Sequence, residues 1–287
     1  MITRLKPVIL FLVLLSIFVF FSMQLEKQRE SLLSASFIEH TLPSKLIGLT
    51  SLEFKGLASD FLLFKFMTFI GGKVAQKDVI DEAQWESLVT TLDTITDLDP
   101  YFWDAYLFAE VFLAWDARKF EDANRLLLKG TQYIPDNYRV FYYLGFNYFY
   151  FLKDNENGRK YLMEAARRPG CSSYVANLAA RLSVYTFKHR DGIEFLKVML
   201  GDTKDRATRD QFQMRIKTLE IMEYLEQKIS EFHELYRTYP KTLDDLVRSG
   251  LISRVPADPY GGEFIIMQNG RVYTTSNMLF KKDNLKK

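Results

Sequence analysis

Three prolines recur through the middle of the chain at a nearly constant spacing. Pro100, Pro135 and Pro169 lie 35 and 34 residues apart, and each follows a stretch rich in apolar residues. Because proline cannot continue a helix, a repeat of this length predicts two helices per unit, with the proline marking the end of the second. One such unit cannot bury its own apolar face. The middle of the chain is therefore expected to form stacked helical hairpins.

The repeat that ends at Pro169 carries the most informative pattern. Its first helix places a bulky residue, a Leu-small pair and an aromatic at Phe141, Leu144, Gly145 and Tyr148, and its second helix carries Tyr161. This pattern resembles the tetratricopeptide repeat, in which the small residue lets two helices cross closely. The resemblance covers roughly residues 52–203 and implies an α-solenoid. The competing interpretation is an ordinary helical bundle whose prolines only mark turns.

The neighbouring repeats match less completely. The first, which ends at Pro135, agrees with the pattern at Leu107, Ala123 and Leu127, but Val111 stands where the small residue belongs. The third begins at Ser172, has Leu178 and Ala179 in place and lacks the closing proline. Degenerate outer repeats are typical of the caps of a repeat array.

A further hairpin is expected before Pro100. Its first helix is predicted at Leu57–Ile70, and the segment GGKVAQKD would connect it to a second helix in QWESLVTTLDTITDLDP. Asp60 is the unusual acid in this apolar stretch. The favoured interpretation is that Asp60 caps the start of the helix, and the alternatives are a pair with Lys65 or a functional contact.

First helices of tetratricopeptide repeats line a concave binding face, and the resemblance places an aromatic-rich set there. The expected protein-binding residues are Phe108, Phe112, Trp115, Arg139, Tyr142, Phe146, Phe149, Tyr150 and Asn177. The third repeat contributes the smaller set Ala176, Asn177, Ala180 and Ser183. Aromatic side chains are favoured at binding hot spots. The alternative is that another part of the chain covers this face.

A carboxylate clamp of the kind found in that family is not expected. Such clamps need several Lys, Asn and Arg side chains, and only Arg139 is basic among the corresponding positions. An apolar or aromatic segment of a partner protein is the better match to this face. The partners predicted from the sequence are therefore other envelope proteins.

The N-terminal segment Val8–Met23 is uncharged over its whole length. As a helix it would rise about 24 Å, close to the ~30 Å hydrocarbon core. Arg4 and Lys6 precede it, which predicts a cytoplasmic N-terminus. The expected localisation is the bacterial inner membrane, with residues 5–25 crossing once and the body periplasmic. A cleaved signal peptide is the competing interpretation.

The pattern changes after Gly201. Arg206–Tyr236 predicts one long amphipathic helix, Thr242 can cap a short helix, and Asn269-Gly270 predicts a hairpin with a type I′ turn. The tail resembles the C-terminal region of a type II secretion pseudopilin, a family that can bind calcium there. Asp258 is the matching carboxylate, although a turn cap is its more ordinary role. The predicted domains are thus 1–25, 26–203 and 204–287.

Charge and motifs argue against catalysis and nucleic-acid binding. The chain has 38 basic and 36 acidic residues, so no excess of basic charge indicates a nucleic-acid partner. The three histidines, His40, His189 and His233, are isolated, and Cys171 is the single cysteine. Cys171 lies at a predicted helix start, which can lower a thiol pKa, but a structural thiol is favoured. We predict no cofactor, metal or catalytic residue.

The sequence thus predicts a mainly α protein with an N-terminal transmembrane helix, a tetratricopeptide-like α-solenoid and a small α+β tail. The predicted function is a membrane-anchored protein-binding scaffold or assembly factor of a bacterial cell-envelope complex of the secretion or pilus type. The alternative is an envelope enzyme or a subunit of a maturation chaperone, for which no catalytic motif is present.

Overall fold

The computed structural model describes residues 14–24 and 44–278, and in these ranges the protein is mainly helical, as predicted. Its α-helices are α2 (Ser44–Thr50), α3 (Lys55–Gln76), α4 (Glu82–Leu98), α5 (Trp103–Phe108), α6 (Phe120–Tyr133), α7 (Tyr138–Phe146), α8 (Asn155–Ala166), α9 (Ser173–Tyr185), α10 (His189–Asp202), α11 (Arg206–Tyr236) and α12 (Leu243–Arg248). Two π-helical segments, η2 (Ala109–Asp116) and η3 (Asn147–Phe151), continue α5 and α7. The strands β1 (Phe264–Ile266) and β2 (Val272–Thr274) pair antiparallel.

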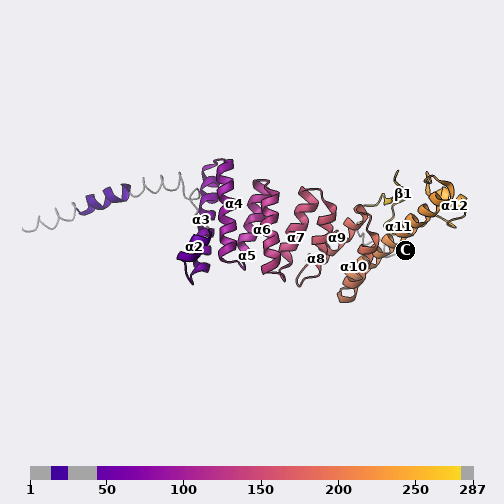
Figure 1. Ribbon diagram of the computed structural model, residues 1–287, viewed down its shortest axis with the longest axis horizontal. Coiled ribbons are helices and arrows are strands. Elements are labelled where there is room, and N and C mark those ends of the chain that lie inside the picture. The colour runs from indigo at the N-terminus through magenta and orange to yellow at the C-terminus, as the bar shows by residue number, and fades with distance from the viewer. Residues whose placement is uncertain (1–13, 25–43, 279–287) are drawn as a thin grey trace, which may run out of the picture. The chain divides into compact units, whose positions relative to one another are not determined.

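The chain divides into two compact units, an N-terminal unit that ends at Leu126 and a C-terminal unit that begins at Leu127. The division falls inside α6, whereas the sequence suggested a boundary after residue 203. In the N-terminal unit, α3 and α4 lie side by side (Figure 1). Their shared core contains the buried side chains Leu62, Phe66, Ile70, Leu88, Leu92 and Ile95.

Helix α3 is longer than the predicted Leu57–Ile70 helix. It continues through Gly71 and Gly72, which the sequence placed in a connection, and ends at Gln76, after which Lys77 adopts the left-handed conformation. Lys73 Nζ lies 2.6 Å from an Asp78 carboxylate oxygen and stabilises this end. Asp60 is exposed and lies one turn inside the helix, so the interpretation of Asp60 as its N-cap is wrong.

Three successive helical hairpins follow at regular intervals along the chain. Their first helices begin at 103, 138 and 173, and their second helices begin at 120, 155 and 189. The turn between the two helices contains a residue with positive φ in each hairpin: Arg118, Lys153 and Phe187. In the C-terminal unit, α8 packs against both α7 and α9 (Figure 1). The predicted closing prolines Pro100, Pro135 and Pro169 each follow the end of a helix, as expected.

Gly145 lies where α7 and α8 cross, as the sequence predicted. A Cβ atom on Gly145 would lie 2.8 Å from the backbone nitrogen of Leu162, which is too close for any side chain. The second helix therefore presents Leu162 to the crossing, whereas Tyr161 stacks on Tyr148 with ring centroids 5.6 Å apart.

The π-helical segments are defined by wider backbone hydrogen bonds. The Ala117 amide donates to the Phe112 carbonyl in η2, and the Leu152 amide donates to the Asn147 carbonyl in η3, five residues apart in each case. Helix α9, the first helix of the third hairpin, carries no such segment. Accordingly, the interval between positive-φ residues is 35 in the first step and 34 in the second.

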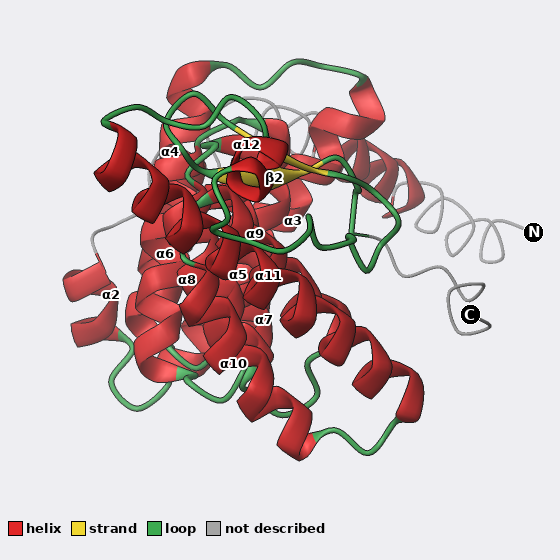
Figure 2. Cartoon of the chain, turned by 90° about the vertical axis from the view of Figure 1, so that its right-hand side faces the viewer, coloured by secondary structure: helices red, strands yellow, loops and turns green. Residues whose placement is uncertain are grey.

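Helix α11 spans Arg206–Tyr236, which confirms the predicted bounds. Its predicted apolar face is buried and comprises Phe212, Ile216, Leu219, Met222 and Leu225. This helix packs mainly against α10 and α9 and also contacts β2. Figure 2 shows the strands and α12 close together. Thr242 forms a capping box with Asp245 at the start of α12, as its sequence indicated.

The hairpin turn differs from the predicted type I′ turn. That type needs positive φ at both central residues, but of the Asn269-Gly270 pair only Gly270 has positive φ, at 77°. The Met267 amide donates to the Arg271 carbonyl, which closes a three-residue loop. Asn269 Oδ1 accepts a hydrogen bond from the Arg271 amide at 3.1 Å. The loop is thus a turn followed by a bulge at glycine.

The predicted membrane localisation is contradicted. Within the part of the chain that the structure describes, no helix combines the length and the apolar character that a bilayer crossing requires. Residues 1–13 of the expected anchor lie outside the described residues.

Candidate protein-binding site

An aromatic row, defined as Tyr142, Phe146 and Tyr150, runs along one side of α7 and η3. Consecutive ring centroids lie 6.1 and 5.1 Å apart, and the second pair is stacked. Tyr150 is 47% exposed, and Lys153 Nζ lies 5.1 Å from the centre of its ring. Leu144 and Gly145 are buried against α8. The structure thus brings together three of the residues expected on the binding face.

Two further residues of this hairpin that were expected on the binding face, Arg139 and Phe149, lie in different surroundings. Arg139 is exposed in the first turn of α7, with its guanidinium 5.9 Å from the Tyr138 ring centroid. Phe149 instead lies against α8, because a Cβ added at Gly158 would meet the Phe149 Cβ at 2.9 Å. The extra residue in η3 changes the direction of the side chains that follow it, so Phe149 leaves the row and Tyr150 joins it.

The expected residues of the first repeat lie in the N-terminal unit. The Phe108 and Phe112 rings lie 6.1 and 5.6 Å from the buried Phe66 ring, so both side chains pack on α3. Trp115 is 52% exposed, and its indole nitrogen donates to the buried Glu110 carboxylate at 3.1 Å. Of these three residues, only Trp115 presents a largely open side chain.

Asn177 belongs to a contact within the chain. Its amide nitrogen donates to Gln211 Oε1 of α11 at 3.1 Å. The other residues expected beside it, Ala176, Ala180 and Ser183, are fully buried, so the prediction that they line a binding face is wrong. The long helix therefore covers α9, and its main packing partners do not include α7.

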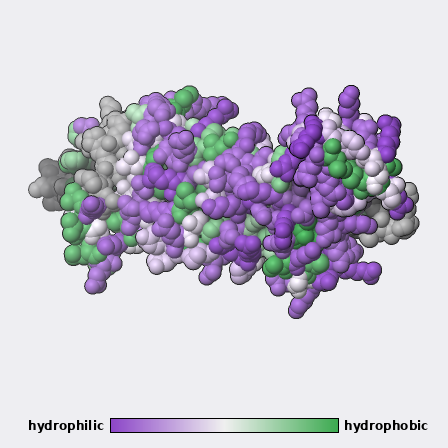
Figure 3. Space-filling model, turned by 45° about the vertical axis from the view of Figure 1, so that its right-hand side comes forward, coloured by the Kyte–Doolittle hydropathy of each residue, from purple (hydrophilic) through white to green (hydrophobic). Residues whose placement is uncertain are grey.

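A second exposed surface was missed by the sequence reasoning. One face of α3 carries large apolar side chains that are at least half exposed, namely Leu57, Phe61, Phe64 and Met67. Figure 3 shows hydrophobic side chains gathered on the left, over α2 and α3. Their spacing of three and four residues places them on one side of the helix. Contiguous apolar surface of this kind is typical of interaction sites.

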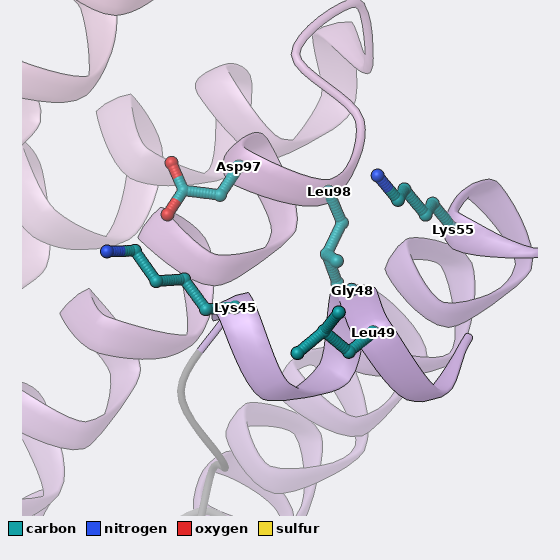
Figure 4. Close-up of a pocket in the computed structure, with 6 residues that line it drawn as sticks. All are labelled: Lys45, Gly48, Leu49, Lys55, Asp97 and Leu98. Carbon is teal, nitrogen blue, oxygen red and sulfur yellow. The ribbon is translucent and has the colours of Figure 1, made fainter. Parts of the chain in front are cut away.

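A hollow of about 550 Å³ lies among α2, α3 and α4. Figure 4 shows Lys45 and Asp97 on one side of it and Lys55 on the other, with Leu49 and Leu98 between them. The charged groups surround an apolar floor, and no nucleophile stands beside a base among the lining residues.

A glutamate network fixes the C-terminal hairpin to the helices. Glu226 of α11 accepts hydrogen bonds from the Val272 amide and from the Arg271 guanidinium, both at 3.0 Å. His189 Nε2 lies 3.3 Å from the same carboxylate. Burial acts to raise the pKa of Glu226, but the bonds from His189 and the Val272 amide outweigh it, so the net effect is a lowered pKa.

Asp258 acts as a turn cap. Its two carboxylate oxygens accept from the Tyr260 amide at 2.9 Å and from the Thr274 hydroxyl at 2.5 Å. Across residues 14–24 and 44–278 there is no cluster of three or more His, Cys, Asp or Glu side chains with the geometry of a metal site. Burial raises the pKa of the Cys171 thiol to about 11, so its helix-start position does not activate it.

Comparison with known proteins finds no match among protein-family models, curated proteins or solved structures.

Proposed function

We propose that this protein is a non-catalytic protein-binding scaffold built from tetratricopeptide-like hairpins that stack into an α-solenoid. The observation that carries the proposal is the aromatic row of α7 and η3. The three rings follow one another at 6.1 and 5.1 Å, and Tyr150 at the end of the row is 47% exposed. Aromatic side chains of this kind contribute strongly to protein interfaces because they bury much area at little entropic cost.

The regular hairpins support the repeat part of the proposal. Three pairs of helices recur at intervals of 34 or 35 residues, each with a positive-φ residue at the same place in the turn. The close crossing at Gly145 matches the role of the small residue in tetratricopeptide repeats. These features favour a repeat array over a bundle whose helices are unrelated to one another.

The chemistry around the row suggests the kind of partner. Arg139 precedes the row in α7, and Lys153 follows it two residues after the end of η3. A segment with apolar anchors and acidic flanks would satisfy both the rings and the two cations. The resemblance of the tail to pseudopilins suggests that this partner belongs to a secretion-type or pilus-type assembly, in which the protein would act as an assembly factor.

Peptide selection on the full-length chain tests the proposal. We expect the selected peptides to share apolar or aromatic anchors. The double variant Phe146→Ala with Tyr150→Ala should bind them at least ten-fold more weakly, because it removes two hot-spot side chains, a loss of about 1.4 kcal/mol or more. Circular dichroism and cooperative unfolding would show that the variant remains folded.

The matched control is Tyr224→Ala with Tyr236→Ala, which removes two exposed rings from α11 in the same unit. This control should leave peptide binding unchanged. Equal binding by the two double variants would refute the aromatic row as the site, and the absence of any selected peptide with apolar anchors would refute the proposed partner chemistry.

A further inference from the structure

Two arginines lie on neighbouring helices of the C-terminal unit without an acidic partner. Arg181 of α9 and Arg215 of α11 are 34 residues apart, and the positive charge of Arg181 disfavours the charged form of Arg215. Within the described ranges, neither forms an ion pair with an Asp or Glu side chain. The Nε atoms of both guanidinium groups are buried and have no hydrogen-bond acceptor.

Arg215 is the more deeply buried of the two, with 5% of its surface exposed. Its Nη2 atom donates to the Met278 carbonyl at 2.6 Å, and its Nη1 atom lies against the Met278 sulfur, which is a weak acceptor. A guanidinium carries five donors. One strong acceptor therefore leaves most of its hydrogen-bonding capacity unused.

Asp258 acts on the charge of Arg215 without forming an ion pair with it. Asp258 favours the charged form of Arg215 by Coulomb attraction, but both of its oxygens are bonded to other groups, Tyr260 N and Thr274 Oγ1. Burial lowers the pKa of Arg215, and Arg181 lowers it further. A buried charge without a paired anion is costly, so a counter-anion would be strongly favoured here.

A cavity of about 530 Å³ lies beside this charge, and Arg215 is one of its walls. Ser173 and Tyr174, the first two residues of α9, line the same cavity, so the positive end of a 13-residue helix faces it. Asn177 donates to Gln211 Oε1 at 3.1 Å. This bond orients the Gln211 amide and leaves its NH₂ group as a further donor in the cavity wall.

We propose that this cavity binds an oxyanion, a carboxylate or phosphate group, with Arg215 as the charged donor and Gln211 and Ser173 as neutral donors. The planar guanidinium fork matches the two oxygens of a carboxylate or phosphate better than it matches a spherical halide. Tyr174 and Tyr260 form aromatic walls that can hold the body of the ligand. The site is separate from the aromatic row, and its failure would leave the proposed function untouched.

Thermal unfolding of the full chain with acetate, inorganic phosphate or chloride at equal ionic strength tests the proposal. An anion that binds only the folded state raises the melting temperature in a saturable way. We expect a rise with acetate, with phosphate or with both, relative to chloride. A response to acetate alone assigns a carboxylate ligand, and a response to phosphate alone assigns a phosphate group. Identical melting in all three salts would overturn the proposal.

The variant Arg215→Met separates a site from a general salt effect. Replacing a buried charge by an apolar side chain of similar length is often neutral or stabilising. We therefore expect this variant to melt at or above the wild-type temperature in chloride and to lose the response to the active anion. Arg190→Met, which removes an exposed arginine of α10, should keep the full response.

A milder change keeps the test decisive if Arg215→Met does not fold. Gln211→Leu removes the neutral donor from the cavity wall and leaves the charge in place. Calorimetric titration with the active anion should show several-fold weaker binding for Gln211→Leu and unchanged binding for Arg190→Met. Unchanged affinity in Gln211→Leu, or a full anion response in Arg215→Met, would contradict the proposed site.

Discussion

Helices α7 and α9 occupy corresponding places in successive hairpins of the same unit, yet they present opposite chemistry at corresponding positions. Thirty-five residues beyond Tyr142, Phe146 and Tyr150 the chain has Asn177, Arg181 and Tyr185. Two aromatic side chains of α7 are thus replaced by polar ones in α9.

This difference in side-chain polarity corresponds to a difference in what packs on each helix. The long helix α11 packs on α9. The Asn177 side chain of α9 donates a hydrogen bond to Gln211 of α11. Tyr185 also faces the tail, with its ring 6.0 Å from that of Tyr273. Successive rings of the aromatic row lie 6.1 and 5.1 Å apart, and the main packing partners of α11 do not include α7. Polar side chains therefore accompany the covered face, and aromatic side chains accompany the more open one.

Gly145→Leu should have the largest effect, because it attacks the crossing that holds α7 against α8. The new side chain would meet Leu162 backbone at 2.8 Å, so the helices must move apart. We expect a loss of about 3 kcal/mol in the free energy of unfolding, the upper part of the range for overpacking. Chemical denaturation measures it, and Gly201→Leu, where a Cβ meets nothing within 4 Å, is the control. Equal stability of the two variants would show that the crossing is looser than described.

Glu226→Gln should weaken the cover over α9 by releasing the hairpin. The carboxylate bonds to Val272 N and the Arg271 guanidinium are charge-assisted, and their loss should cost about 2 kcal/mol. Hydrogen exchange at the Val272 amide should become faster. Glu223→Gln, one turn earlier and exposed, should change neither quantity. Unchanged protection of Val272 in Glu226→Gln would mean that the hairpin is held by its apolar contacts alone.

The same carboxylate predicts the response to acid. The pKa of Glu226 is lowered in the folded protein, so its stabilising contribution is complete above the unfolded pKa of about 4.3 and is lost as the pH falls through the folded value. Wild-type stability should therefore fall below about pH 4 more steeply than that of Glu226→Gln. Parallel stability curves for the two proteins over this range would contradict the network.

Replacing aromatic residues of α7 by the polar residues found at the corresponding positions of α9 should change the free energy of unfolding little and should weaken peptide binding strongly. Tyr142→Asn with Phe146→Arg removes two rings of the aromatic row but none of the buried contacts of Leu144. We expect a stability change below about 1 kcal/mol, as for partly exposed positions, and complete loss of selected-peptide binding. A large drop in the unfolding free energy would show instead that the row serves the fold.

The smallest expected effect is on the ionisation of Tyr273, in strand β2 of the tail, at high pH. Burial, aided by the hydrogen bond with Tyr185, raises the pKa of Tyr273 to about 12. A raised pKa means that its stabilising contribution holds below the unfolded value near 10 and is lost as the pH rises through about 12. Tyrosinate absorbance should therefore show a late-ionising group that is missing in Tyr273→Phe. An unchanged titration in the variant would contradict this assignment.

Local patterns in the sequence predicted the local structure well. The bounds of α11, the cap at Thr242, the closing prolines and the crossing at Gly145 each depend on residues close together in the chain or on helix periodicity. Such features are fixed by backbone chemistry that a sequence displays directly. The aromatic row was predicted on the same basis.

Other features depend on contacts that no short segment reveals. The bonds of Glu226 join residues 37 and 46 positions away, and the packing of Phe108 and Phe112 on Phe66 depends on how α3 turns toward them. The place of Phe149 depends on the π-helical turn, which a count at 3.6 residues per turn cannot anticipate. Only the folded chain brings Arg181 near the buried Arg215, because the two residues lie 34 positions apart.

The π-helical turns also set where this chain tolerates a change in length. A helix with one residue looped into a wider turn can lose that residue and return to the regular α form without moving the helix that follows it. The first helices of the first two hairpins carry the extra residue, and that of the third hairpin does not. In all three hairpins, the turn contains one residue with positive φ at the corresponding position. The end of each first helix is therefore the natural hinge for single-residue insertions and deletions, and alignments of related chains should be expected to slip by one position there.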